Sequence, residues 1–149
     1  MHGQCLCEEV QFEILGKLPR LYQCHCSQCR KQSGASSNTA TVIHAGDFRW
    51  IKGQERVSSW RHATGFRSHF CVTCGCPVPN PLFDQPYIWV PVGLLESTGH
   101  GDICVHLFVG SRADWEALPS SGILYDTMPT LSEFVGLLHE GENLWQRQH

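Results

Sequence analysis

The sequence predicts a mainly β protein with antiparallel sheets and short helices near its C-terminus. Three observations predict this class: segments in which apolar and polar residues alternate, frequent Gly and Pro between those segments, and helix-capping patterns late in the chain. The 149 residues are enough to enclose one hydrophobic core. Because the chain shows no repeat, low-complexity run or linker, residues 1–149 are expected to form a single domain.

The expected strands are short. Residues 10–14 alternate with a period of two, as a strand with one buried face does. Residues 103–109 have the pattern of a late, half-buried strand. Such strands, separated by Gly and Pro, predict small, curved, mostly antiparallel sheets. The same alternation occurs within residues 39–43, 48–51, 67–71 and 87–92.

Two short helices are expected after the strands. Residues 111–114 have the Ser-x-x-Asp form of a helix start, and Pro119 would end that helix. A second helix would start at Thr130 and open a helical extension over residues 130–149. Its apolar face would pack on the sheet, and a dimer contact is the alternative. That face consists of Leu131, Phe134, Val135 and Leu138.

Charge and hydropathy exclude two classes of partner. The net charge is −3, and the eleven Lys and Arg are scattered rather than gathered in the basic stripe of a nucleic-acid-binding protein. No apolar run approaches the roughly 20 residues that cross a membrane. The N-terminus leaves no room for a secretory signal before the first cysteine motif. We expect a cytoplasmic protein that binds neither nucleic acid nor membrane; its oligomeric state is not predicted.

Cysteine is unusually abundant, with nine residues, eight of which fall into three tight groups. An odd number at gaps of two or three residues is a poor disulfide framework. In a reducing compartment such groups indicate metal sites or reactive thiols instead.

Two of the groups together predict a structural zinc site. Cys5 and Cys7 are two apart, so on an extended strand both thiols point to one side. Cys71 and Cys74 form a Cys-x-x-Cys turn followed by Gly75, which is the form of a zinc knuckle. Four thiolates make the closed tetrahedral site typical of structural zinc. Such a site would link the N-terminal strand to the middle of the chain.

A redox pair is the alternative for Cys71 and Cys74. Redox pairs of this spacing usually start a helix after a strand. A helix is forbidden here by the prolines that follow, namely Pro77, Pro79 and Pro81.

The remaining group predicts a second zinc that is open to substrate. Cys24, Cys26 and Cys29 offer three thiols within six residues. Three protein ligands with a free fourth position are the mark of a catalytic zinc. A helical turn over residues 27–34 would place its N-terminus beside these thiols and stabilise thiolate charge. Candidate contacts for substrate carboxylates are Arg30, Lys31 and Arg67.

The fourth position of the second site has two candidate ligands. His25 lies within the motif, although it points away if Cys24 and Cys26 share a side. Cys76 is the other candidate, and the alternative for it is a simple buried thiol. Cys104 stands alone in an apolar strand and is expected in the core.

These motifs resemble the glutathione-dependent formaldehyde-activating enzymes, also called S-(hydroxymethyl)glutathione synthases. The resemblance covers roughly residues 3–130 and departs from the family pattern at Glu8, usually Gly, and at Cys76, usually Ser or Thr. It rests on residues 3–7, 10–13, 24–35, 48–50, 70–75, 92–95 and 106–115.

The resemblance implies an Mss4-like fold of antiparallel sheets around a structural zinc held by Cys5, Cys7, Cys71 and Cys74. It also implies a catalytic zinc at Cys24, Cys26 and Cys29. The implied activity is that of a carbon–sulfur lyase that joins a thiol, possibly glutathione, to formaldehyde. Two other functions fit the same residues: a zinc-stabilised scaffold module without catalysis, and a thiol sensor that releases zinc on oxidation.

Overall fold

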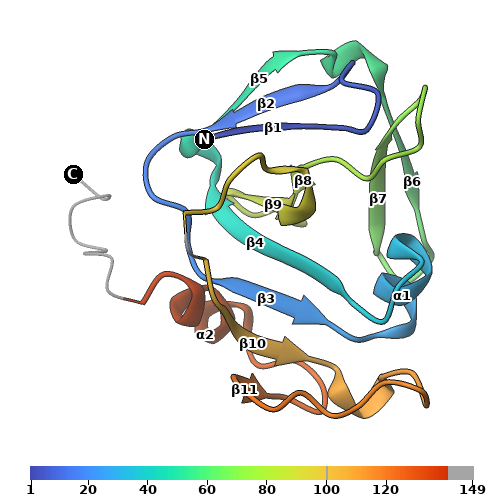
Figure 1. Cartoon of the computed structure of the whole chain (residues 1–149), viewed down its shortest axis with the longest axis vertical. Helices are drawn as coiled ribbons and strands as arrows, with labels where there is room; N and C mark the ends of the chain where they lie inside the picture. The colour runs from blue at the N-terminus through green and yellow to red at the C-terminus, as the bar shows by residue number, and fades with distance from the viewer. Residues whose placement is uncertain (100, 141–149) are drawn as a thin grey trace.

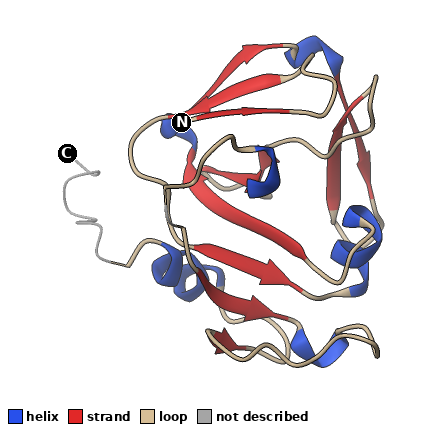
Figure 2. Ribbon diagram, viewed as in Figure 1, coloured by secondary structure: helices blue, strands red, loops and turns tan. Residues whose placement is uncertain are grey.

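A computed structural model describes residues 1–99 and 101–140, whose strands form three sheets (Figures 1 and 2). A six-stranded sheet has the order β11-β10-β3-β4-β9-β8, a three-stranded sheet the order β1-β2-β5, and β6 pairs with β7. The strands are β1 (His2–Gln4), β2 (Gln11–Ile14), β3 (Leu21–Cys24), β4 (Asn38–His44), β5 (Phe48–Lys52), β6 (Val57–Arg61), β7 (Arg67–Cys71), β8 (Asn80–Pro81), β9 (Tyr87–Pro91), β10 (Ile103–Leu107) and β11 (Ile123–Leu124).

The sheets confirm the mainly β class, and most of their pairs are antiparallel as expected. The two exceptions are the pairs that β10 makes with β3 and with β11, both of which are parallel. A parallel pair needs a long connection rather than a tight turn. For β3 and β10 this connection is the chain between them, which forms β4 to β9 before β10 pairs with β3.

The core consists of three groups of buried side chains. One group, including Phe12, Ile14 and Val90, lies between the three-stranded sheet and the six-stranded sheet. A second, including Val42 and Phe134, covers the side of the large sheet that α2 contacts. The third is small and contains two of the cysteines. It consists of Cys5, Val10, Cys71 and Val78.

The predicted second helix is confirmed as α2 (Leu131–Leu138). The Thr130 side chain caps it by accepting a hydrogen bond from the backbone N–H of Glu133 at 3.2 Å. The Phe134 ring meets the Tyr22 ring edge-on at 4.7 Å between centroids, so the apolar face packs on the sheet of its own chain. The rest of the predicted extension, residues 141–149, lies outside the described residues.

The predicted helix from Ser111 to Pro119 is wrong. This segment forms turns after a short 3-10 helix at Val109–Ser111. Its pattern supplies no apolar helical face, since Trp115 is 70% exposed. A short helix without a face to bury gains too little to offset its nucleation cost. The segment instead directs Glu116 into the protein interior.

One glycine allows β5 to end against the loop that carries Cys7. Gly53 has φ +82°, in the left-handed region, and a Cβ there would lie 2.0 Å from the carbonyl oxygen of Glu9. Any side chain would push the two backbones apart.

None of the helices within residues 1–99 and 101–140 could span a bilayer.

Candidate metal centre

The first cysteine cluster joins the loop after β1 to the end of β7. Its four thiol sulfurs lie within 4.8 Å of one another. The Cys7 sulfur is 3.6 Å from that of Cys5 and 3.7 Å from that of Cys71. The turn at Cys71 closes where the backbone N–H of Gly75 donates to the Cys71 carbonyl at 2.8 Å. The members of this four-cysteine cluster are Cys5, Cys7, Cys71 and Cys74.

These distances fit a zinc ion and do not fit disulfides. Zinc bound by thiolates at about 2.3 Å in a tetrahedron places neighbouring sulfurs about 3.8 Å apart. A disulfide would bring them to about 2.05 Å, and all nine cysteines are free. Burial raises the pKa of the Cys74 thiol, but the backbone N–H groups of Cys76 and Cys7 and neighbouring thiols outweigh it and lower that pKa to about 6. The cluster can therefore hold a metal ion.

The second cluster forms where β3 runs into the helix α1 (Ser27–Ser33). Its three thiol sulfurs also lie within 4.8 Å of one another. Cys24 ends β3, Cys26 is the N-cap of α1, and Cys29 lies in the first helical turn. The predicted helical turn over residues 27–34 is thus confirmed, with Gly34 in the left-handed conformation as its C-cap. We call Cys24, Cys26 and Cys29 the cysteine trio.

The trio concentrates negative charge on its middle member. Hydrogen bonds from the thiols of Cys24 and Cys29, and from the backbone N–H groups of Cys29 and Gln28, lower the pKa of Cys26 to about 2. The contact with Cys26 raises the pKa of Cys24 to about 12. A deprotonated thiol is the form that binds a metal. The trio can therefore also hold a metal ion, although zinc binding at either cluster stays a prediction.

Neither candidate for the fourth ligand is grouped with the three sulfurs of the trio. His25 is fully buried and faces away from it, with both ring nitrogens engaged elsewhere. Cys76 packs beside the four-cysteine cluster, and its thiol donates to the Pro77 carbonyl at 3.5 Å. Cys104 is buried in β10, as expected of a core residue.

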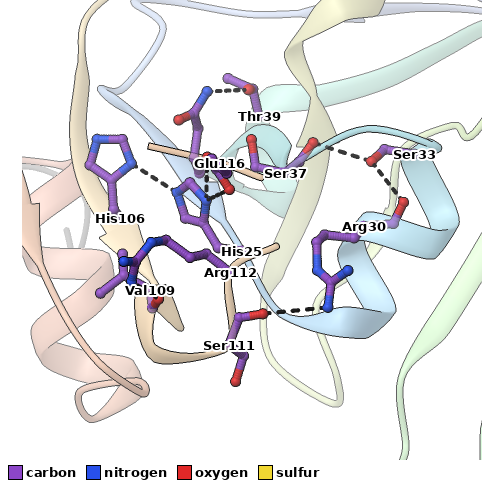
Figure 3. A network of polar contacts seen from close by, with 11 residues as sticks. His25, Arg30, Ser33, Ser37, Thr39, His106, Val109, Ser111, Arg112 and Glu116 are labelled. Carbon is purple, nitrogen blue, oxygen red and sulfur yellow. Dashed lines mark hydrogen bonds and ion pairs between the residues drawn. The ribbon is translucent and has the colours of Figure 1, made fainter. Parts of the chain in front are cut away.

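His25 contacts the neighbouring strand β10 and the loop that carries Glu116 (Figure 3). Its Nδ1 donates to the Glu116 carboxylate at 3.0 Å, and its Nε2 lies 3.0 Å from Nδ1 of His106. The backbone N–H of His25 donates to the Leu107 carbonyl at 2.9 Å. Burial, followed by the nearby His25, lowers the pKa of His106. The residue between two trio cysteines is thus fixed by the partly buried Glu116 carboxylate and by β10.

Removing Glu116 should weaken metal binding at the trio. Glu116→Ala leaves the buried His25 nitrogen without its acceptor, which costs about 1–3 kcal/mol. We expect zinc affinity at the trio to fall about 10- to 100-fold, the usual effect of losing a partner that orients a metal site. A competition titration with a chelator measures this. The matched control is Glu96→Ala, which removes a surface contact to His2; an equal loss in both variants would contradict the role of Glu116.

The three predicted carboxylate contacts have different outcomes. Arg67 lines the pocket beside the trio, and Lys31 lines an adjoining groove. Arg30 does neither, because its guanidinium turns toward the Ser111 carbonyl at 3.4 Å (Figure 3). Arg30 therefore supports the loop after β10 rather than a ligand.

A pocket of about 330 Å³ opens beside the trio. Sequence reasoning missed it because its walls come from distant segments. Two of its residues, Phe83 and Phe108, have φ of +50° and +57°. The left-handed conformation costs a bulky residue about 1–2 kcal/mol, and such strain often marks functional sites. No local sequence pattern signals it at these phenylalanines.

Fold and site together define a class: small, mainly β proteins with one four-cysteine cluster and one three-cysteine cluster able to hold metal ions. The chain belongs to the glutathione-dependent formaldehyde-activating enzyme family, whose sequence model matches residues 1–111. A crystal structure of a Rhodobacter sphaeroides protein, a structural genomics target, is similar to the chain, with 25% sequence identity and a TM-score of 0.55. The similarity covers 69% of this chain and 99% of that one. No curated protein matches the chain.

Proposed function

We propose that this protein is a zinc-dependent carbon–sulfur lyase or synthase that acts on a thiol–aldehyde adduct such as S-(hydroxymethyl)glutathione. One observation carries the proposal: three thiols converge in the wall of a pocket that a small molecule can enter. Membership of the family supports the same reaction class.

The two clusters would have different roles. Four thiolates complete a tetrahedral shell, so the four-cysteine cluster would hold a structural zinc with no free position. Cys5 and Cys71 are buried there, away from the pocket. Three thiolates leave one position for a substrate atom. Cys24, Cys26 and Cys29 are therefore the proposed ligands of the reactive metal.

The reaction forms one bond between the thiol sulfur and the carbonyl carbon of the aldehyde. The electron pair of the C=O π bond moves to the oxygen, which ends with the proton that the thiol loses. Cleavage is the reverse, and neither direction needs an oxidant. A free thiol with a pKa of about 8.5 is mostly protonated at neutral pH. A zinc ion in the trio would supply the Lewis acid that favours the thiolate.

The protein's own residues would position the thiol. His25, held by Glu116, fixes the backbone between two trio cysteines. The groove beside the pocket contains Lys31 and His62, and shares Gln28 and Gln32 with the pocket. The Lys31 ammonium suits a glutathione carboxylate. Nine free cysteines also support a reducing, cytoplasmic location.

The proposed activity can be tested by exchange spectroscopy on the zinc-loaded protein. Carbon-13 formaldehyde and glutathione are mixed, and the rate of interconversion between free aldehyde and adduct is measured. We expect saturable acceleration over the uncatalysed rate, with glutathione binding detectable by titration calorimetry. No acceleration and no heat at millimolar glutathione, with a single tightly held zinc per chain, would contradict the proposal and favour a scaffold module.

A further inference from the structure

The pocket beside the trio is much larger than formaldehyde requires. Formaldehyde adds one carbon and one oxygen to the thiol sulfur. The pocket has a volume of about 330 Å³, within the range of sites that enclose whole small molecules. Most of this space would stay unfilled by a hydroxymethyl group.

The walls of the pocket are aromatic. Their residues come from β3, β9, α2 and the loops between strands, so the tertiary fold assembles them. Arg67 is the only Lys, Arg, Asp or Glu among the described residues that line the pocket, and its guanidinium lies 3.5 Å from the Asp84 carboxylate. The aromatic lining consists of Tyr22, Phe66, Phe83, Trp89, Phe108 and Phe134.

Four polar side chains of the lining are paired with one another. The Trp89 indole N–H donates to the Tyr22 hydroxyl at 2.8 Å. The Gln28 amide donates to the Thr64 hydroxyl at 2.8 Å. These pairs leave the ring faces as the surface that an occupant meets. Binding of an apolar group to such a surface is favourable, because the group leaves water. Binding of a charged group is not, because the charge loses its hydration without gaining a partner.

The part of the pocket nearest α2 is built by residues beyond the family match. Met128 and Phe134 line the pocket, whereas the match ends at residue 111. Phe83 and Phe108 hold left-handed backbone in the same lining. The cysteine trio lies inside the matched region. The chain therefore combines the thiols of the family with an apolar pocket closed by its own C-terminal segment.

We propose that this pocket binds the side chain of an apolar aldehyde, aromatic or branched, whose carbonyl carbon bonds to the thiol sulfur at the trio. This inference rests on the proposed function and names the aldehyde of that reaction. The polar body of the thiol would extend toward the neighbouring groove and Lys31. Atoms balance as before: the C–S bond forms, and the thiol proton ends on the carbonyl oxygen.

Two stable thioethers test the proposal by binding rather than by turnover. S-benzylglutathione places an aromatic ring on the sulfur, and S-methylglutathione places a group of about the size that formaldehyde adds. Calorimetry on the zinc-loaded protein should give a Kd at least about tenfold lower for the benzyl compound, because its ring leaves water for the pocket. Equal affinities, or tighter methyl binding, would overturn the proposal.

A surface variant connects this preference to the pocket. Phe83 is 53% exposed and left-handed, so Phe83→Gly removes a wall while it relieves the backbone. The benzyl preference should fall at least about threefold with an unchanged Tm. The control is Ile51→Ala, an exposed apolar residue on β5, which should leave the preference unchanged. Equal preferences in all three proteins would place the ring elsewhere and overturn the proposal.

Failure of this inference differs from failure of the proposed function. If formaldehyde exchange is accelerated while the two thioethers bind equally, the lyase proposal stands and the apolar aldehyde is wrong. If neither thioether binds and no exchange is accelerated, both proposals fail.

Discussion

Replacing Cys71 by serine is expected to lower the free energy of unfolding by several kcal/mol and to abolish the metal at the four-cysteine cluster. Cys71 is 0% exposed, and its cluster joins β7 to the loop after β1. Structural zinc in small domains contributes on the order of 10–16 kcal/mol of apparent binding free energy. Losing even part of that is a large share of the free energy of unfolding of most domains, which is about 5–15 kcal/mol. Denaturant titration together with metal analysis measures both effects.

Two matched variants separate metal loss from the cost of burying a hydroxyl. Cys104→Ser changes a buried thiol outside both clusters, and Cys76→Ser changes a thiol that packs beside the four-cysteine cluster. Each should cost about 1–3 kcal/mol at most and keep the metal content of the parent. If Cys71→Ser matched these controls in stability and metal content, the structural zinc site would be wrong.

Replacing Cys26 by serine is expected to remove the reactive metal while the fold and its stability are kept, in contrast to Cys71→Ser. Cys26 is the N-cap of α1, and its sulfur accepts from the backbone N–H of Cys29 at 3.4 Å. Serine is among the best N-cap residues, so α1 should still form. The low-pKa thiolate is lost, however. We expect one zinc per chain instead of two, and an exchange rate at least about 100-fold lower.

The control for Cys26→Ser is Cys76→Ser, the same chemical change outside the trio. The two variants should have similar melting temperatures, and only Cys26→Ser should lose metal and activity. Retained exchange activity in Cys26→Ser would show that the trio is not the reactive site.

The cysteine clusters were predictable because their spacing is a local property. The Cys-x-x-Cys-Gly turn needs no information from elsewhere. The extended strand expected at Cys5 and Cys7 is wrong, because both residues lie in a turn after β1, where the backbone N–H of Glu8 donates to the Cys5 carbonyl at 3.1 Å. The structure brings both pairs together within 4.8 Å. The trio follows in the same way from Cys24 at a strand end and Cys26 at a helix cap.

Contacts between distant segments were not predictable in this way. Glu116 reaches His25 across 91 positions in the chain, and the capping pattern at Ser111 suggested a helix instead. A local pattern favours a helix only when a face can be buried, which this segment lacks. The parallel pairing of β3 with β10, and the pocket it helps to form, likewise depend on how the whole chain returns to the sheet.

The central claim is that two metal ions bind to two separate sets of thiols. An anomalous difference map at the zinc absorption edge, from crystals grown without added metal, tests it most directly. The account predicts one peak surrounded by Cys5, Cys7, Cys71 and Cys74, and a second at Cys24, Cys26 and Cys29. Disulfides within the first set under reducing conditions, or no peak at either position, would contradict it.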